Sequence, residues 1–441
     1  MTRAADTLNR DILRLAVPAL GALVAEPLFL IVDSALVGHL GVTPLAALGI
    51  ASAVLQTIVG LMVFLAYSTT PAVARRLGAG DASGAVRAGV DGLWLALGLG
   101  FVLALAGSLA TPLLVGLFAA GPEVAREAET YLGISMWGLP AMLIVFAATG
   151  LLRGMQDTVT PLWIAAAGFG ANALLNAFFI YGLGWGIAGS ATGTVVAQWA
   201  MVAAYVAVTA RLASRHAASV RPRGEGLRGS ARSGGWLLLR TVSLRLALLA
   251  TVAVATGLGT AELAGWQVAY TIFSTAAFVL DALAIAAQAL VGKGIGAGDP
   301  RTVRRILRRT LAWGGWFGVL VGLAVGGLSG VIGLVFTGDP AVAALVQPAL
   351  IVLAVAQPVC GVVFVLDGVL MGAGDGRYLA LAGALNLVPF APALVALALL
   401  HPSGAAGLAW LAAAFFGVYM LARLATLGWR IRGPAWLAQP A

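Results

Sequence analysis

Twelve apolar stretches of at least 20 residues follow one another along this chain of 441 residues. Each is long enough to cross a hydrocarbon core about 30 Å thick as an α-helix. Their approximate ranges are 12–37, 45–72, 90–118, 130–150, 161–181, 187–210, 235–257, 263–291, 310–336, 343–371, 378–400 and 405–428. Only 10% of the residues are charged, against roughly a quarter in a soluble domain. The sequence therefore predicts an all-α polytopic membrane protein.

Residues of scarce types recur along the chain at a constant offset of 218 positions. Phe118, Pro122, Pro140, Gly154 and Asp157 reappear as Phe336, Pro340, Pro358, Gly372 and Asp375, and the GAGD of 78–81 reappears at 296–299. This register predicts two six-helix repeats: an N-lobe over 1–210 and a C-lobe over 235–441, joined by a cytoplasmic linker over 211–234 that needs no fold of its own. Duplicated lobes of this kind are typical of alternating access.

The formal net charge of +9 is explained by topology rather than by nucleic acid, which we do not expect as a partner. With the N-terminus placed in the cytoplasm, nearly all basic residues outside the spans fall on that side, and only Arg126 lies clearly outside. We therefore expect a multi-pass protein of the plasma membrane with both termini cytoplasmic. Because each half has an even number of spans, the repeats insert in the same orientation.

Residue types that support chemistry or metal binding are few. The single cysteine, Cys360, excludes an intramolecular disulfide, and the three histidines lack ligand spacing. We find neither a nucleophile beside a base nor a motif such as HExxH, so we do not expect an enzyme or a cofactor. The repeated GAGD loops are interpreted as cytoplasmic turns in which the aspartate caps the next helix.

Ionisable side chains inside spans cost about 2.5–3.5 kcal/mol each on insertion scales, so each is a functional candidate. Asp91 lies near a cytoplasmic span end, where we expect water to solvate it. The candidates deeper in the membrane are Glu26, Asp33, Arg245, Asp281 and Asp367.

Topology predicts which polar groups share a depth. At about 1.5 Å per residue, Asp33 of the first span, Asn176 of the fifth and Thr194 of the sixth all lie within roughly 10 Å of the outer boundary. Asn172 is one turn from Asn176 on the same face and extends the polar track inward. An acid, two amides and a hydroxyl suit a proton site, a cation site of hard oxygen ligands, or both. The alternative is that Asn172, Asn176 and Thr194 only join helices by hydrogen bonds.

Other candidate residues surround this predicted cluster or lie in the second half. Glu26 precedes Asp33 by seven residues on nearly the same helix face, so the two carboxyls can pass a proton or titrate together. In the C-lobe we expect Arg245 to pair with Asp281 or Asp367, either for coupling or as a structural ion pair.

Several segments resemble the DinF-like branch of the MATE (multidrug and toxic compound extrusion) family. They are PALGALVAEPLFLIVDSALVGHLG, STTPAVARRLGAGD, LDALAIAAQALVGKGIGAGD and FVLDGVLMGAGD. The likeness extends over nearly the whole chain. It implies a V-shaped bundle of two six-helix lobes of the MATE/MOP type with a central cavity. It also implies export of organic cations or other amphipathic drugs or metabolites against inward H⁺ or Na⁺, with no cofactor besides the coupling ion, and we expect a monomer in the lipid bilayer.

The family's coupling residues can be carried over position by position. The first-helix acid corresponds to Asp33, the fifth-helix pattern to Asn172 and Asn176, and the sixth-helix threonine to Thr194. Many members carry Asp where this chain has Asn176, so a negative charge is missing and H⁺ is favoured over Na⁺ at this cluster.

In the second half the resemblance is partial. The seventh-helix Glu of other branches has no counterpart here, whereas Asp367 resembles their tenth-helix acid. Glu26 lies outside the family pattern.

The sequence thus predicts a proton-coupled antiporter in which protonated Asp33 and a bound cationic substrate disfavour each other. The alternative is a flippase for lipid-linked oligosaccharide or cell-wall precursor, which should contain a basic cavity for pyrophosphate. A channel is disfavoured by the buried titratable groups within a duplicated bundle.

Overall fold

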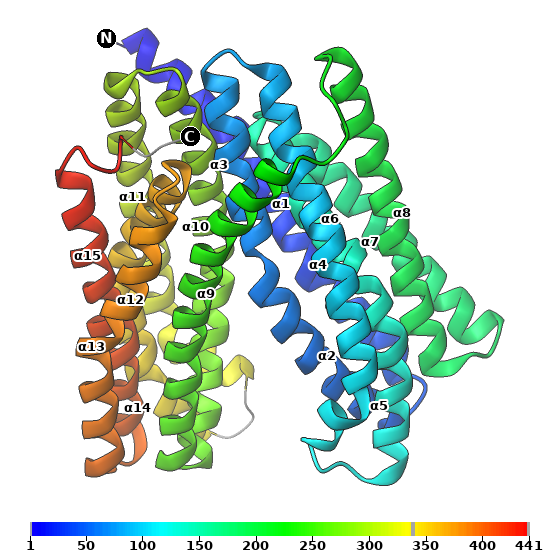
Figure 1. The fold of residues 1–441 in the computed structure, drawn as a ribbon. Coiled ribbons are helices and arrows are strands. Elements are labelled where there is room, and N and C mark those ends of the chain that lie inside the picture. Colours follow the sequence, from blue (N-terminus) through cyan, green and yellow to red (C-terminus); the bar gives the residue numbers. More distant parts are fainter. Residues whose placement is uncertain (1, 337–339, 439–441) are drawn as a thin grey trace. The chain divides into compact units, whose positions relative to one another are not determined.

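The computed structural model describes residues 2–336 and 340–438, and all regular structure there is helical (Figure 1). The helices are α1 (Thr2–Gly38), α2 (Val42–Met62), α3 (Phe64–Gly78), α4 (Ala82–Gly116), α5 (Pro122–Ser135), η1 (Met136–Gly138), α6 (Leu139–Gly154), α7 (Val159–Ala177), η2 (Phe178–Gly182), α8 (Gly186–Arg215), α9 (Gly224–Leu258), α10 (Thr260–Gly296), α11 (Pro300–Phe336), α12 (Pro340–Gly372), α13 (Gly376–Leu400), α14 (Gly404–Ala412), η3 (Ala413–Tyr419) and α15 (Met420–Arg432).

In the described residues, 12 helical segments are long and apolar enough to cross a membrane, which confirms the predicted number. Four of these segments combine consecutive helices: α2 with α3, α5 with η1 and α6, α7 with η2, and α14 with η3 and α15. Helices suit this environment because their backbone hydrogen bonds close within the segment, where lipid offers no partners. Most helices extend beyond the predicted apolar ranges, as α4 and α9 do at their N-terminal ends.

The chain divides into two compact units of similar size. The N-unit comprises Val17–Gly234, and the C-unit comprises Gly235–Ala441 together with Met1–Ala16. The start of α1 thus belongs with the second half. There the side chains of Arg309 and Trp313 on α11 donate hydrogen bonds to Asn9 Oδ1.

The linker between the halves is shorter than predicted. Helix α8 continues to Arg215 and α9 already begins at Gly224, so 216–223 is the segment between them. This segment is held against α4, because Trp94 Nε1 donates to Val220 O at 2.9 Å and Arg223 donates to Asp91 at 2.9 Å. The expectation that Asp91 is solvated is therefore wrong: it is buried and forms an ion pair with Arg223.

Backbone conformation also repeats at the offset of 218 residues. Positive φ angles occur at Gly41 and Gly259, at Gly80 and Gly298, at Gln156 and Gly374, and at Gly186 and Gly404, all in this register. The predicted capping role of the GAGD aspartates is confirmed by two hydrogen bonds: Asp81 accepts from Gly84 N at 2.7 Å, and Asp299 accepts from Thr302 N at 2.9 Å. The turns at these four pairs of positions are therefore built alike in both halves.

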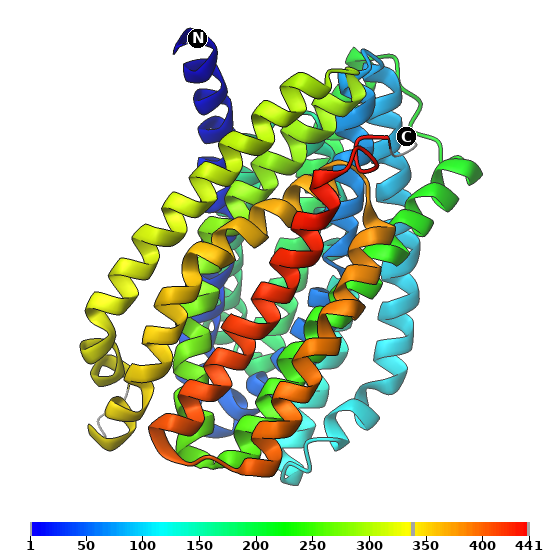
Figure 2. The same ribbon diagram turned by 90° about the vertical axis from the view of Figure 1, so that its left-hand side faces the viewer.

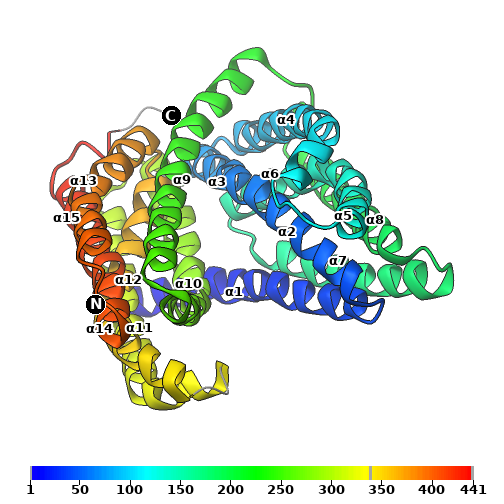
Figure 3. The same cartoon turned by 90° about the horizontal axis from the view of Figure 1, so that it is seen from below.

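Each unit is organised around one closely packed helix. In the N-unit α6 lies beside α3 and α4 (Figure 3) and also contacts α8. In the C-unit α12 contacts α10, α11 and α15. Helix α15 lies between α12 and α13 (Figure 2). This arrangement brings side chains of α9, α12 and α15 together inside the C-unit.

Glycines at equivalent positions allow the central helices to approach their neighbours. A Cβ at Gly154 would lie 2.8 Å from Thr70 O of α3, and a Cβ at Gly372 would lie 2.5 Å from Gln288 O of α10. Gly150 and Gly368, one turn earlier, meet the backbone of Ala66 and Ala284 in the same way. Small residues spaced four apart are a common contact between membrane helices, since close van der Waals packing drives their association.

We predict that Gly372→Ala lowers the stability of the protein by about 1–3 kcal/mol, because the methyl group must displace the α10 backbone. The matched control is Gly327→Ala on α11, where an added Cβ meets nothing within 4 Å. Thermal unfolding in detergent, followed by tryptophan fluorescence, measures both. Equal melting temperatures for Gly372→Ala and the wild type would show that this contact is not close.

Candidate functional site

Asp33 of α1 is at the centre of a buried polar cluster in the N-unit. Its Oδ1 accepts hydrogen bonds from Asn176 Nδ2 of α7 and from Ser190 Oγ of α8, both at 2.7 Å. Its Oδ2 accepts a longer bond, 3.4 Å, from the hydroxyl of Tyr131 on α5. Side chains of three other helices thus converge on the carboxylate of α1.

The cluster continues along the facing sides of α7 and α8. Asn172 Nδ2 donates to Thr194 Oγ1 at 2.9 Å, and Asn176 Nδ2 lies 3.4 Å from the same oxygen. All four residues predicted from their depth, Asp33, Asn172, Asn176 and Thr194, are buried and belong to this network. Their functional role remains a prediction, but the structure brings them together.

Glycines set the distance between α7 and α8 at this cluster. A Cβ at Gly193 would overlap Asn176 Oδ1 and lie 3.0 Å from Asn176 N. A Cβ at Gly189 would lie 2.8 Å from the carbonyl carbon of Phe179. The two glycines are one turn apart and adjoin Ser190 and Thr194, so the same stretch of α8 that permits close approach also supplies the hydroxyl groups.

The C-terminal end of α1 is attached to the segment that follows Asn176. There the chain forms the π-helical turn η2, and Tyr181 of this turn donates to Leu36 O at 2.6 Å. Such π-helical turns are frequent at functional sites. The hydrogen bond holds α1 beside α7 three residues after Asp33.

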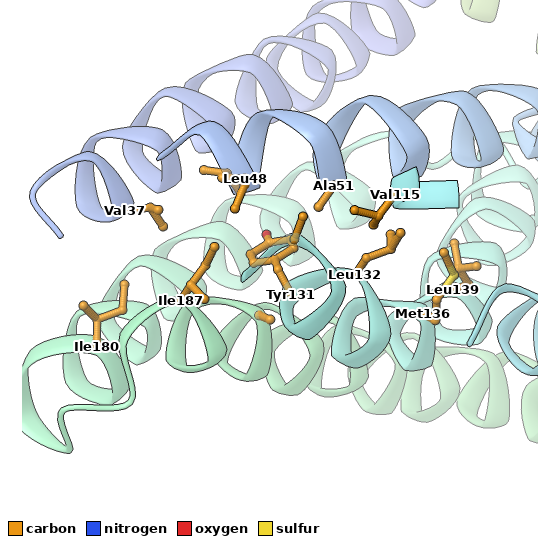
Figure 4. Packing of buried hydrophobic residues seen from close by; sticks show 13 residues of the cluster. Val37, Leu48, Ala51, Val115, Tyr131, Leu132, Met136, Leu139, Ile180 and Ile187 are labelled. Atoms are coloured by element: carbon orange, nitrogen blue, oxygen red, sulfur yellow. The ribbon is translucent and has the colours of Figure 1, made fainter. Parts of the chain in front are cut away.

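Two members of the network, Ser190 and Tyr131, were not predicted from the sequence. Tyr131 is buried in an apolar cluster with residues such as Leu48, Leu132 and Ile187 (Figure 4), from which only its hydroxyl reaches Asp33. The sequence contained a signal for each of these two residues. Ser190 precedes Thr194 by one helical turn, and Tyr131 lies near the outer end of the fourth span, at the depth of Asp33.

The electrostatic environment of Asp33 lacks positive charge. Across residues 2–336 and 340–438, no arginine, lysine or histidine forms an ion pair with it. Its partners are one amide and two hydroxyl groups. In addition, Asn176 Oδ1 is buried and has no hydrogen-bond partner in the part of the chain that the structure describes. The cluster therefore combines a carboxylate that has no counter-charge with an unused oxygen acceptor, which is suited to taking up a proton or a cation.

Glu26 is not part of this cluster. It lies seven residues earlier on α1, its side chain is exposed, and it makes no hydrogen bond or ion pair with the described residues. Phe29, between the two acids, stacks on Phe169 of α7 with ring centroids 5.2 Å apart. A direct contact between Glu26 and Asp33 is therefore not observed.

The acid of the tenth span has different partners from those predicted. Asp367 on α12 accepts hydrogen bonds from Arg240 of α9 and Arg423 of α15, and all three residues are buried. The expected pairing of Arg245 with Asp367 is wrong, because Arg245 lies on an exposed side of α9. Arg245 lies five positions after Arg240, so the two side chains point about 140° apart around the axis of α9. Asp281 on α10 is half-buried.

We predict that the infrared carbonyl band of protonated Asp33 reports these contacts. In acid-minus-neutral difference spectra, Ser190→Ala should shift this band to higher wavenumber, because the carboxyl group loses a 2.7 Å hydrogen bond. Asp33→Asn should remove the band and thereby assign it. Thr192→Ala is the matched control, since Thr192 bonds only Ala188 O of its own helix. A band that Ser190→Ala leaves in place would contradict the geometry.

Comparison with known proteins identifies the family to which this chain belongs. A sequence model of the MatE family matches residues 18–178 and 238–393, one range in each half. The chain is 31% identical over 447 residues to Protein DETOXIFICATION 44, chloroplastic, of Arabidopsis thaliana, with 96% of this chain and 82% of that protein covered. It is 28% identical over 297 residues to DNA damage-inducible protein F of Escherichia coli (strain K12), with 66% and 64% covered.

A solved structure agrees in fold. The Vibrio cholerae MATE transporter VcmN, in its bent form, matches with a TM-score of 0.88 at 21% identity, over 99% of this chain and 100% of that one. The resemblance to the MATE family is confirmed by these matches, and the match to DNA damage-inducible protein F agrees with the DinF-like branch. The family and its structural neighbours are transporters, which implies transport rather than catalysis. This chain therefore belongs to the MATE family and is a multi-pass membrane transporter that acts on small molecules.

Proposed function

We propose that this transporter is an antiporter that exports organic cations or other amphipathic compounds in exchange for protons moving inward. The observation that carries the proposal is the state of Asp33, a buried carboxylate with neutral partners and no ion pair among the described residues. An acid in such surroundings needs a mobile positive charge. That charge is the coupling ion.

The exchange follows from linkage between two positive charges. A proton on Asp33 removes the negative charge that favours a cationic substrate, so proton and substrate disfavour each other without needing to touch. Release of the proton on the inner side then restores the charge that favours the next substrate. Each charge that crosses 100 mV contributes about 2.3 kcal/mol, which supports roughly a fifty-fold gradient of a neutral compound.

The donor pattern around Asp33 favours H⁺ over Na⁺. Asn176 turns its Nδ2 toward the carboxylate, and the Ser190 hydroxyl donates to the same oxygen. A sodium ion needs oxygen ligands at this place, so Asn176 would have to turn its unpaired Oδ1 inward. With a single carboxylate in the cluster, the charge that would offset dehydration of the ion is also small. A proton requires no such rearrangement.

The membrane and orientation belong to the same proposal. The basic residues of the loops favour cytoplasmic termini under the positive-inside rule, and we infer the plasma membrane and a monomer. One relative is named as chloroplastic, so location in a membrane other than the plasma membrane would contradict this part of the proposal. The flippase alternative is not favoured, since relatives over most of the chain carry a detoxification name.

We predict that Asp33→Asn abolishes gradient-driven export, because the amide cannot take up and release the proton. The measurement is efflux of a fluorescent organic cation from liposomes that contain the protein, under an imposed proton gradient or, separately, a sodium gradient. Asp81→Asn is the matched control: the same change of acid to amide occurs in a cytoplasmic turn, and asparagine caps a helix about as well as aspartate.

The two gradients separate the possible results. Export driven by protons in the wild type and in Asp81→Asn, but lost in Asp33→Asn, is the expected pattern. Sodium-driven export would make the Asp33 cluster a cation site and overturn proton coupling. Wild-type rates and pH dependence in Asp33→Asn would exclude Asp33 as the coupling residue.

A further inference from the structure

The first three turns of α11 present arginine side chains on one side of the helix. We call this set the arginine face; its members, all exposed, are Arg301, Arg304, Arg305, Arg308 and Arg309. The residues between them are buried: Val303, Ile306, Leu307 and Thr310. Because the buried residues recur at helical spacing, the arginines share the opposite side of α11.

Positive charge is in excess at the arginine face. In residues 2–336 and 340–438 none of the five arginines forms a salt bridge. Arg309 instead donates a hydrogen bond to Asn9 Oδ1 of α1. The single acid between 293 and 309 is Asp299, which attracts Arg305 and also accepts from Thr302 N at 2.9 Å as the cap of α11. Arginine stays protonated in proteins, so this one carboxylate offsets only part of the charge.

The arginine face continues directly into a surface that faces lipid. Ala312, Trp316 and Leu320 follow Arg308 at intervals of four residues, and all three are exposed, Trp316 by 71%. Exposed apolar side chains within a span contact lipid, and tryptophan is enriched where a span meets the headgroups. Helix α11 packs mainly on α10 and α12 (Figure 1), so its other side is uncovered along this row.

The length of α11 places the arginine face at the headgroups. With 37 residues at about 1.5 Å each, the helix is about 55 Å long, whereas the hydrocarbon core is about 30 Å thick. Its ends therefore extend past the core. The arginines occupy the first three turns, and the apolar row begins one turn after Arg308, so the guanidinium groups lie in the headgroup layer beside lipid.

The first half shows that the repeat does not need these charges. At the 218-residue offset, Arg304, Arg308 and Arg309 correspond to residues of α4 that are all buried: Val86, Val90 and Asp91. Over 75–91 the chain has three basic residues and two acids, against six and one over 293–309. The positive-inside rule depends on how many basic residues the loops contain. It does not require a row of arginines in line with the lipid-facing surface.

We propose that the arginine face of α11 binds the headgroups of anionic phospholipids. Phosphate oxygens accept hydrogen bonds from guanidinium groups, often two at once. The acyl chains of the bound lipid then lie along Ala312, Trp316 and Leu320. Clusters of four to eight basic residues next to a span are typical of anionic-lipid recognition, and each arginine near the headgroups strengthens it about fivefold. A zwitterionic lipid is disfavoured, because its own ammonium group offsets the phosphate. The inference is independent of the proposed export mechanism, since no residue of the Asp33 cluster takes part.

The test measures lipid preference at this surface in the full-length protein. Ala312→Cys, one turn after Arg308, receives a fluorescent label, while the native Cys360 is 0% exposed and does not react. The vesicles contain equal amounts of phosphatidylcholine and phosphatidylglycerol, and one lipid at a time carries brominated chains, which quench the label on contact. We expect an association constant at least about fivefold higher for phosphatidylglycerol. Val331→Cys, exposed near the other end of α11, is the matched probe and should show no preference.

Two triple variants of the labelled protein separate this surface from general charge. The first removes three charges from the arginine face: Arg304→Gln, Arg305→Gln and Arg308→Gln. It should bring the ratio of the two association constants close to one. The control removes three charges from exposed residues of the N-unit: Arg211→Gln, Arg215→Gln and Arg221→Gln. It should leave the preference at position 312 unchanged.

Quenching at position 331 in both triple variants shows that α11 is inserted in the bilayer, so a lost preference cannot be attributed to misfolding. Three results would overturn the proposal. They are equal association constants at position 312 without the triple substitutions, a preference that survives the first triple variant, and a preference that the control variant abolishes as well.

Discussion

Close contact between glycine-bearing helix faces is the interaction on which both halves of this transporter depend. Lipid is as apolar as the helix surfaces, so helices gain little by leaving it and must instead pack tightly. Gly150 and Gly154 bring α6 onto α3, and Gly368 and Gly372 bring α12 onto α10. At the Asp33 cluster, Gly193 does the same for α7 and α8. The polar contacts of Asp33 therefore follow from a packing rule that also holds the units together.

The two halves share a backbone design but differ in electrostatics. In the first, Asp33 accepts hydrogen bonds from neutral amide and hydroxyl donors. In the second, Asp367 is bonded to two arginines and its charge is permanently compensated within the protein. Duplication thus supplied two similar scaffolds. Divergence at a few buried positions gave one half a carboxylate with neutral partners and the other half a carboxylate bonded to two arginines.

Depth in the membrane was the most informative quantity available before the structure. It correctly grouped Asp33, Asn176 and Thr194, because rise per residue converts sequence position into height once the topology is known. Depth says nothing about direction around a helix axis. Arg245 was predicted as a partner from its depth alone, and the structure turns it outward, whereas Arg240 donates to Asp367. The prediction that Asp91 is solvated was wrong for another reason. It assumed that the end of the span is open to water, whereas the segment over 216–223 covers it.

The sequence by itself determined the helices, their number, the duplicated register and the approximate height of each polar residue. These properties depend on hydrophobicity, chain length and scarce residue types, which are local or periodic along the chain. Only the tertiary structure decided the partners: Ser190 and Tyr131 for Asp33, and Arg240 with Arg423 for Asp367. The physical reason is that partners depend on helix rotation and on which neighbours come close. Those are set by packing among helices far apart in sequence.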